Sequence, residues 1–138
     1  MLRAHPPITQ DGARQLNPLQ LAHIGDTVWD LLVRETLLHE GKNLRHMHSG
    51  AVQRVNAAAQ AKALERIRAE LTEAEEAIVL RGRNAHAHHV SPHHQTQADY
   101  AASTALEALV GYLYLTGQEE RLLRLFALAQ EDTCPEQN

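Results

Sequence analysis

The chain has 138 residues and a formal net charge of −4, with 13 basic and 17 acidic side chains. This length favours one domain with a real hydrophobic core, and the charge argues against a generally basic nucleic-acid binder. Alanine, leucine and glutamate abound while aromatic residues are few, which predicts an all-α bundle of about five to seven helices. No export signal and no run of 18 apolar residues is visible, and Cys134 is the single cysteine, so we expect a cytoplasmic protein without a membrane span.

The two ends of the chain lack a hydrophobic period. Residues 1–16 contain Pro6 and Pro7, and we expect a loose N-terminal arm there. The periodic segments begin after it, which predicts one domain over residues 17–131. The polar residues 132–138 are predicted to form a disordered tail.

The segment 17–41 predicts the first long helix. Asn17 can cap the free amides, and Pro18 at the first helical position has no amide to satisfy. Gly41 is expected to end the helix. Apolar residues recur at helical spacing and predict one buried face: Leu19, Ala22, Trp29, Leu32 and Val33.

Asp26 is expected in the middle of that buried face. A carboxylate there is expensive to bury unless a cation or a hydrogen-bond donor meets it. Gly25 beside it costs about 1 kcal/mol of helix propensity relative to alanine. This cost suggests that another backbone or a ligand approaches closely at this point.

A second helix, predicted to start at Asp99 or Thr96 and to stop at Gly117, carries another acid in an apolar setting. Glu107 lies among Leu106, Leu109, Val110, Leu113 and Leu115, and Gly111 follows one turn later. A cap or an ordinary salt bridge would explain either acid alone. Together, Asp26 and Glu107 suggest a shared divalent metal with oxygen ligands, because the ion offsets the cost of desolvating the acids.

Further helical segments lie between and after these two. They are a short turn or helix within residues 42–50, an amphipathic helix over 51–71 and another over 118–131. Thr72 and Glu75 form a capping box, which starts a helix that ends near Gly82. Glu73, Glu75 and Glu76 are interpreted as first-turn acids of that helix. The alternative, paired metal-binding acids of a helical nucleotide pyrophosphatase, is the less favoured interpretation.

A histidine-rich stretch, residues 83–97, contains Pro92 and shows no period, which predicts a surface loop. Candidate phosphate contacts are Arg81 and Arg83 just before it, and His86, His88, His89, His93 and His94 within it. A solvated loop without a role and a transition-metal site on the histidine pairs stay open. A second basic cluster consists of His39, Lys42, Arg45, His46 and His48. If both stretches lie on one face, an anionic polymer could bind there.

Four segments in order carry a resemblance to a known family. They read LAHIGDTVWDLLVR, VNAAAQAKAL, EEAIVLRGRNA and ALEALVGYLYLTGQEERL. From about Leu19 to Leu125 they resemble Mini-ribonuclease III, the short members of the ribonuclease III family that lack a separate double-stranded-RNA-binding domain. The resemblance implies a ribonuclease III-type endonuclease domain that forms a homodimer.

The resemblance also implies an activity and a site. Asp26 matches the acid of the signature GD, and Glu107 matches the glutamate of EAL. In the family these carboxylates hold Mg²⁺, for which Mn²⁺ is a possible substitute, and the enzyme hydrolyses phosphodiesters in double-stranded RNA. The known task of the Mini group is maturation of the large-subunit ribosomal RNA precursor. The alternative is a catalytically weak or inactive binder of structured RNA with the same fold.

Departures from the family pattern concern the metal and the loop. Full-length ribonucleases III carry additional acids where this chain has Leu19, Ala22 and Thr104, which suggests fewer protein ligands and weaker metal binding here. Histidines 86–94 stand where family members typically place lysines, so RNA affinity should depend on pH.

Other side chains are given local interpretations. We expect His23 to be partly buried and structural, and Asp30 to be an exposed charge. Trp29, Tyr112 and Tyr114 are expected to be core or dimer contacts rather than base-stacking platforms, because a duplex offers no splayed bases. Periodicity alone does not decide whether Arg54 and Lys62 face RNA or solvent.

Overall fold

The architecture is that of a computed structural model, which describes residues 2–85 and 96–130. In these residues there are seven α-helices, one 3₁₀ helix and no strand, which confirms the predicted all-α fold. The helices are α1 (Gln10–Arg14), α2 (Pro18–His39), α3 (Leu44–Val55), α4 (Ala57–Ile67), the 3₁₀ helix η1 (Arg68–Glu70), α5 (Glu73–Asn84), α6 (Gln97–Leu115) and α7 (Glu119–Ala129). None of them is both long enough and apolar enough to cross a membrane.

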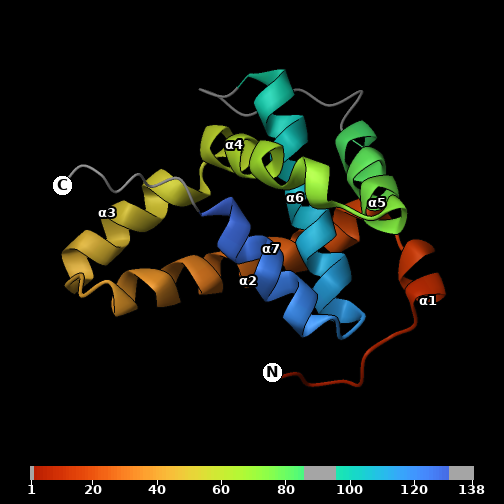
Figure 1. The fold of residues 1–138 in the computed structure, drawn as a ribbon, viewed down its shortest axis with the longest axis horizontal. Helices are drawn as coiled ribbons and strands as arrows, with labels where there is room; N and C mark the ends of the chain where they lie inside the picture. The colour runs from red at the N-terminus through yellow and green to blue at the C-terminus, as the bar shows by residue number, and fades with distance from the viewer. Residues whose placement is uncertain (1, 86–95, 131–138) are drawn as a thin grey trace.

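Helices α2 and α6 cross in the middle of the molecule (Figure 1). The sequence signals for the ends of α2 are confirmed. The side chain of Asn17 accepts a hydrogen bond from the Leu19 amide at 2.8 Å, and the side chain of Gln20 accepts one from the Asn17 amide at 3.0 Å. Gly41 follows the helix with a φ of 82°, a left-handed conformation that glycine adopts without steric cost.

Two glycines let the backbones of α2 and α6 touch at this crossing. A Cβ atom on Gly25 would lie 1.7 Å from the carbonyl oxygen of Glu107, and one on Gly111 would lie 1.9 Å from that of Leu21. No side chain fits at either position. The prediction that another backbone approaches at Gly25 is therefore confirmed, and the approaching residue is Glu107.

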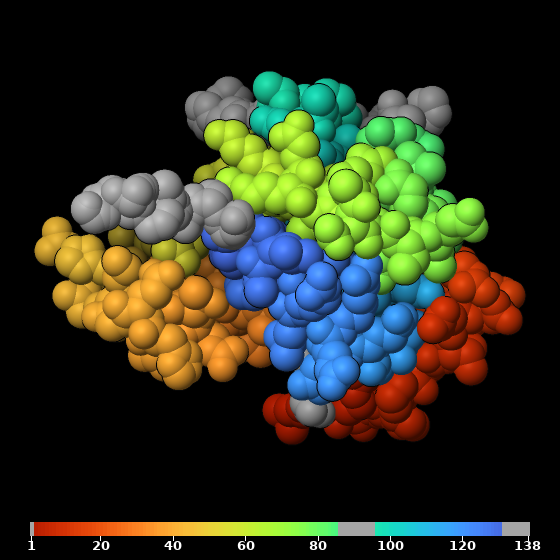
Figure 2. Space-filling model, viewed as in Figure 1, coloured from red at the N-terminus to blue at the C-terminus, as the bar shows by residue number. Residues whose placement is uncertain are grey.

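The hydrophobic core forms around α6, which α4, α5 and α7 cover from one side (Figure 2). Trp29 of α2 is 2% exposed and packs edge-on against Phe126 of α7, with ring centroids 5.0 Å apart. Tyr112 of α6 is also buried. Both aromatic rings therefore contribute to the core, as expected.

The prediction of one helix over residues 51–71 is wrong, because the chain breaks at Asn56. This residue ends α3 in an extended conformation, and its side chain accepts a hydrogen bond from the Ala59 amide at 2.8 Å, which caps α4. Asparagine favours such a cap over a mid-helix position because its side chain competes for backbone groups. The capping box of Thr72 and Glu75 is confirmed, with hydrogen bonds of 3.1 and 2.9 Å.

The N-terminal segment is attached to α6 rather than loose. The Ile8 amide donates to the carbonyl oxygen of Leu115 at 2.9 Å, and Arg3 lies over the ring of Tyr114, 4.5 Å from its centroid. The short helix α1, capped by the side chain of Thr9, buries Ala13 completely. None of these contacts leaves a hydrophobic period in the sequence, which explains why no structure is predicted there.

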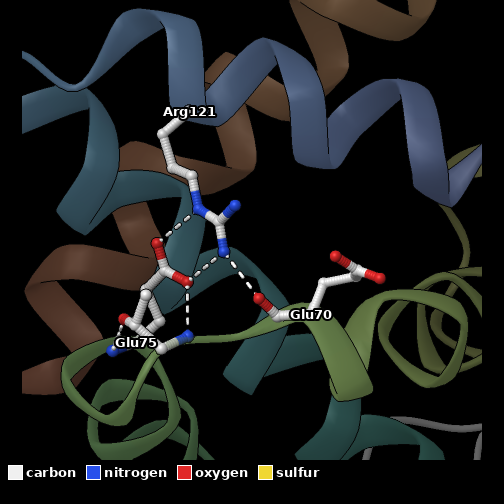
Figure 3. A network of polar contacts seen from close by, with 4 residues as sticks. Glu70, Glu75 and Arg121 are labelled. Atoms are coloured by element: carbon white, nitrogen blue, oxygen red, sulfur yellow. Dashed lines mark hydrogen bonds and ion pairs between the residues drawn. The ribbon is translucent and has the colours of Figure 1, made fainter.

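Glu75 also anchors α7 to the start of α5. The guanidinium of Arg121 donates to both oxygens of this carboxylate at 2.8 Å, and to the backbone carbonyl of Glu70 at 2.7 Å (Figure 3). Burial acts to raise the pKa of Glu75, but the hydrogen bonds and charge of Arg121 and the bonds to Thr72 lower it below its ordinary value. Glu76 pairs in turn with Arg68. The acids at the start of α5 therefore serve as cap and ion-pair partners, in agreement with their interpretation from the sequence.

Candidate active site

The crossing of α2 and α6 brings the side chains of Asp26 and Glu107 together. Asp26 follows Gly25 in α2, and the α6 residue that touches Gly25 is Glu107. The two carboxyl groups share a hydrogen bond. Two acids that are 81 residues apart in the sequence thus meet at one point of the fold.

Asp26 is exposed, so its predicted place in the middle of the buried face of α2 is wrong. Gly25 takes the buried position instead, and the next residue of a helix points about 100° further round the axis, since there are 3.6 residues per turn. Glu107 is partly buried. The pair therefore consists of one carboxylate at the surface and one that reaches into the protein.

The surroundings of Glu107 shift the pKa of its carboxyl group. Burial, the charge of Asp26 and the hydrogen bond with Asp26 raise the pKa of the Glu107 carboxyl to about 8, while the amide of Gln60 acts to lower it. In the absence of a cation, the Glu107 carboxyl therefore keeps its proton at neutral pH. A divalent cation would offset both the burial and the mutual repulsion, so the donor set suits such an ion.

Residues from α4 and α6 surround the buried side of Glu107. Gln60 is 1% exposed, and its Oε1 accepts a hydrogen bond from the hydroxyl of Ser103, which is 8% exposed. Ser103 and Glu107 are four residues apart on α6 and so share one helix face. Gln60 is not among the predicted site residues, and its only signal in the sequence is that it is a polar residue within the alanine-rich stretch before Ala63.

No further acid completes the pair within the described residues. Ala22 and Thr104, two of the positions at which the resemblance implied additional acids in larger family members, are buried, and Leu19 is partly buried. The hydroxyl of Thr104 donates to the carbonyl of Tyr100 at 3.0 Å. The described residues contain no group of three or more histidine, cysteine or acidic side chains that could hold a metal ion. Two carboxylates suit Mg²⁺, which keeps several waters, better than Zn²⁺, which takes three or four protein ligands.

Of the candidate phosphate contacts, the structure describes Arg81 and Arg83. The guanidinium of Arg81 donates to the carbonyl oxygens of Arg14 and Leu16 at 2.7 and 2.9 Å, so it ties α5 to the segment before α2. Arg83 is exposed. His86, His88, His89, His93 and His94 lie outside the described residues. The second basic cluster is exposed around the end of α2 and on α3, and α3 and α5 lie at opposite ends of the molecule, so these helices do not form one compact basic patch (Figure 1).

The remaining side chains have mostly local roles. His23 is exposed, so its predicted partial burial is wrong. Asp30 is partly exposed and pairs with Arg34 at 3.1 Å. Arg54 pairs with Glu40 at 3.0 Å, which links α3 to the end of α2. Lys62 is exposed on α4.

Comparisons with known proteins agree on one family. Residues 19–118 match the family described as Ribonuclease III domain. The chain is 46% identical over 117 residues to Mini-ribonuclease 3 of Symbiobacterium thermophilum, covering 84% of this chain and 89% of that protein. It is 39% identical over 123 residues to Mini-ribonuclease 3 of a Thermoanaerobacter species, covering 88% and 86%. The crystal structure of protein FN1578 from Fusobacterium nucleatum is similar with a TM-score of 0.73 and 30% identity, over 82% of this chain and 90% of that one.

Proposed function

Because the chain belongs to the ribonuclease III family, in its Mini-ribonuclease 3 group, it is an endoribonuclease, and we propose that Asp26 and Glu107 form its catalytic centre. The substrate class of the family is double-stranded RNA. The observation that carries the proposal is the contact between these two acids, one exposed and one partly buried, at the crossing of α2 and α6. This arrangement is what a divalent cation needs and what an ordinary salt bridge does not explain.

The two carboxylates are proposed to hold Mg²⁺, with Mn²⁺ as a substitute. When bound, the ion stabilises the negative charge that develops on the phosphate during hydrolysis. Asp26 faces solvent and therefore the incoming phosphodiester, while Glu107 is fixed by its burial in α6. Release of the proton from Glu107 makes this carboxyl an anionic ligand.

The RNA backbone is proposed to contact Arg83 and the histidines at positions 86, 88, 89, 93 and 94. Arg81 precedes Arg83 by two residues on α5, and its guanidinium donates to the carbonyls of the segment before α2. Arg81 is therefore proposed to hold in place the part of α5 that carries Arg83. The proposed natural substrate is the precursor of large-subunit ribosomal RNA in the cytoplasm, because maturation of this precursor is the known task of the Mini group.

We further propose a homodimer, since one catalytic centre per chain cuts both strands of a duplex only if two chains pair. An apolar groove supports this. It lies on the outer side of α2, has a volume of about 410 Å³ and is lined by Ile24, Val28, Leu31 and Tyr114 among others. Leu31 is 63% exposed, an unusual position for a leucine beside other apolar groups.

The dimer is tested by size-exclusion chromatography with light scattering. Leu31→Lys, which places a charge in the groove, is expected to shift the protein to the monomer mass. Leu44→Lys is the matched control, since Leu44 is 81% exposed on α3 and does not line the groove. A dimer of undiminished stability in Leu31→Lys would exclude this surface.

The activity is tested by incubating the purified protein with a folded RNA duplex and Mg²⁺ or Mn²⁺. Cleavage by the unaltered protein, and its loss in both Asp26→Asn and Glu107→Gln, would support the proposal. Loss in only one of the two variants would contradict the shared centre.

A second candidate function is a catalytically weak or inactive binder of structured RNA. It is favoured by Ala22 and Thr104, which carry no carboxylate at positions where the resemblance implies family acids and are 7% and 4% exposed. Binding of the duplex by the unaltered protein without cleavage in either metal would support this function over the first.

A further inference from the structure

Gln60 is a buried amide without a complete set of hydrogen bonds. It lies in the first turn of α4 and is 1% exposed. Its Oε1 accepts the hydroxyl of Ser103, while its Nε2 makes no hydrogen bond of ordinary geometry within the described residues. Leaving a buried polar group unpaired is costly, so such an atom calls for an explanation.

The unpaired amide belongs to the neighbourhood of Glu107. Gln60 interacts with the Glu107 side chain across the contact between α4 and α6. On α6, Ser103 lies one turn before Glu107, so its hydroxyl and the carboxyl both face α4 at this point. Ser103 thereby fixes the Oε1 end of the amide and leaves the Nε2 end for the carboxyl.

The position of Gln60 is itself well fixed. The side chain of Asn56 caps α4 by accepting a hydrogen bond from the backbone amide of Ala59 at 2.8 Å, and the backbone amide of Gln60 donates to the carbonyl oxygen of Asn56 at 3.0 Å. The next turn of α4 buries Ala63 and Leu64 in the core. The side-chain amide of Gln60 therefore sits on a rigid helix, which a group that orients a metal ligand requires.

We propose that Gln60, held by Ser103, is a positioning residue of the metal site, whose amide donates to one carboxyl oxygen of Glu107 and fixes the orientation of that side chain. This inference rests on the proposed function. It adds to the two acids a polar support from a third helix, α4, that the acid pattern of the sequence does not indicate.

The test compares Mn²⁺ binding to the RNA-free protein by electron paramagnetic resonance. Gln60→Leu keeps most of the side-chain volume and removes the amide, and it is expected to weaken Mn²⁺ binding about tenfold or more, the usual cost of losing such a support. Ser103→Ala frees the amide and should weaken binding in the same direction to a smaller extent. Gln53→Leu, the same change at an exposed position of α3, should leave the affinity unchanged.

Thermal unfolding separates positioning from packing. The proposal predicts that Gln60→Leu folds with a melting temperature at or above that of the unaltered protein, and that raising the Mn²⁺ concentration restores its duplex cleavage. Unchanged Mn²⁺ affinity in a folded Gln60→Leu would overturn the inference and leave the nuclease proposal intact. If Gln60→Leu fails to fold, Ser103→Ala decides, and unchanged affinity there would overturn the inference equally.

The proposed activity can fail separately. Absence of cleavage by the unaltered protein in both metals would overturn the nuclease proposal. A weaker Mn²⁺ affinity in Gln60→Leu would still support the positioning role in that case, because binding is measured without RNA.

Discussion

The α carbon of Gly25 faces the carbonyl oxygen of Glu107 so closely that an added Cβ would lie 1.7 Å from that oxygen. This contact between two backbones places Asp26, the next residue of α2, beside the Glu107 carboxyl. The geometry of the proposed catalytic pair thus depends on a residue that has no side chain.

Gly25→Ala is expected to lower the free energy of unfolding by about 3 kcal/mol, the upper end of the usual cost of overpacking. The added methyl group meets the backbone of α6, which cannot give way without separating the two helices. Activity should fall further than stability, because the two carboxyls move apart. Chemical denaturation and duplex cleavage measure the two effects.

Gly41→Ala is the control for this change. Its Cβ meets no atom within 4 Å, and its φ of 82° is the only strain. The expected cost is about 1 to 2 kcal/mol, that of a left-handed residue other than glycine, with cleavage unaffected once the protein is folded. A smaller loss of stability in Gly25→Ala than in Gly41→Ala would contradict the close crossing.

The raised pKa of Glu107 predicts a pH dependence of stability in metal-free protein. Its folded pKa of about 8 lies above the ordinary value of 4.5, so the folded state binds more protons between these values. The free energy of unfolding should therefore fall as the pH rises through this window, by at most about 1.4 kcal/mol per pH unit from this group. Below about pH 4.5 the contribution of the protonated carboxyl is fully present.

The measurement is urea denaturation in EDTA at about pH 5 and pH 8, for the unaltered protein and Glu107→Gln. The variant has no carboxyl to titrate at this position, so its stability should change less across the window. Parallel pH dependence in the two proteins would show that Glu107 keeps an ordinary pKa.

The pairing of Arg121 with Glu75 predicts a loss of stability in Arg121→Ala. Glu75 is 4% exposed, and removal of the guanidinium leaves its carboxylate with its bonds to Thr72 and without a cationic partner in the described residues. The expected cost at neutral pH is about 1 to 3 kcal/mol, that of a buried group left without a partner. Arg124→Ala is the control on the same helix, since Arg124 is exposed.

The effect of Arg121→Ala should also shrink in acid. The pKa of Glu75 is lowered in the folded protein, so the stability from this pair is present above the ordinary value of 4.5 and is lost as the pH falls through the folded pKa. Denaturation curves at neutral pH and near pH 3 provide the comparison. An equal effect of the substitution at both values would exclude an ionic contribution.

The arginines of α5 are predicted to differ. Arg83→Ala should weaken RNA binding and reduce the slope of log affinity against log salt by about 1, as for one lost phosphate contact. Arg81→Ala should instead lower the free energy of unfolding, because the carbonyls of Arg14 and Leu16 lose their donor. Binding measured over a range of salt, together with denaturation, distinguishes the two. Identical salt slopes for Arg83→Ala and unaltered protein would remove Arg83 from the interface.

Local signals predicted the elements well where one residue decides the conformation. Asn17, Pro18 and Gly41 bound α2 as expected, and Gly25 indicated a close approach before any partner was known. Asp26 and Glu107 were also recognisable, because an acid in an apolar helix is unusual.

Apart from the pairing of Asp26 with Glu107, contacts between distant segments could not be predicted. Gln60 bonds to Ser103 across 43 residues and Arg121 to Glu75 across 46, and neither pair has a local pattern. The position of Asp26 at the surface depends on which residue of α2 meets α6. Asn56 illustrates a milder difficulty, since apolar periodicity continued through a residue whose side chain ends one helix and caps the next.

The most direct test of the central claim is an anomalous diffraction measurement on crystals soaked in Mn²⁺. The account predicts one peak of anomalous density within coordination distance of carboxylate oxygens from both Asp26 and Glu107, and no peak at this place in Glu107→Gln. Density bound to only one of the two acids, or no density there in protein that cleaves duplex RNA with Mn²⁺, would contradict it.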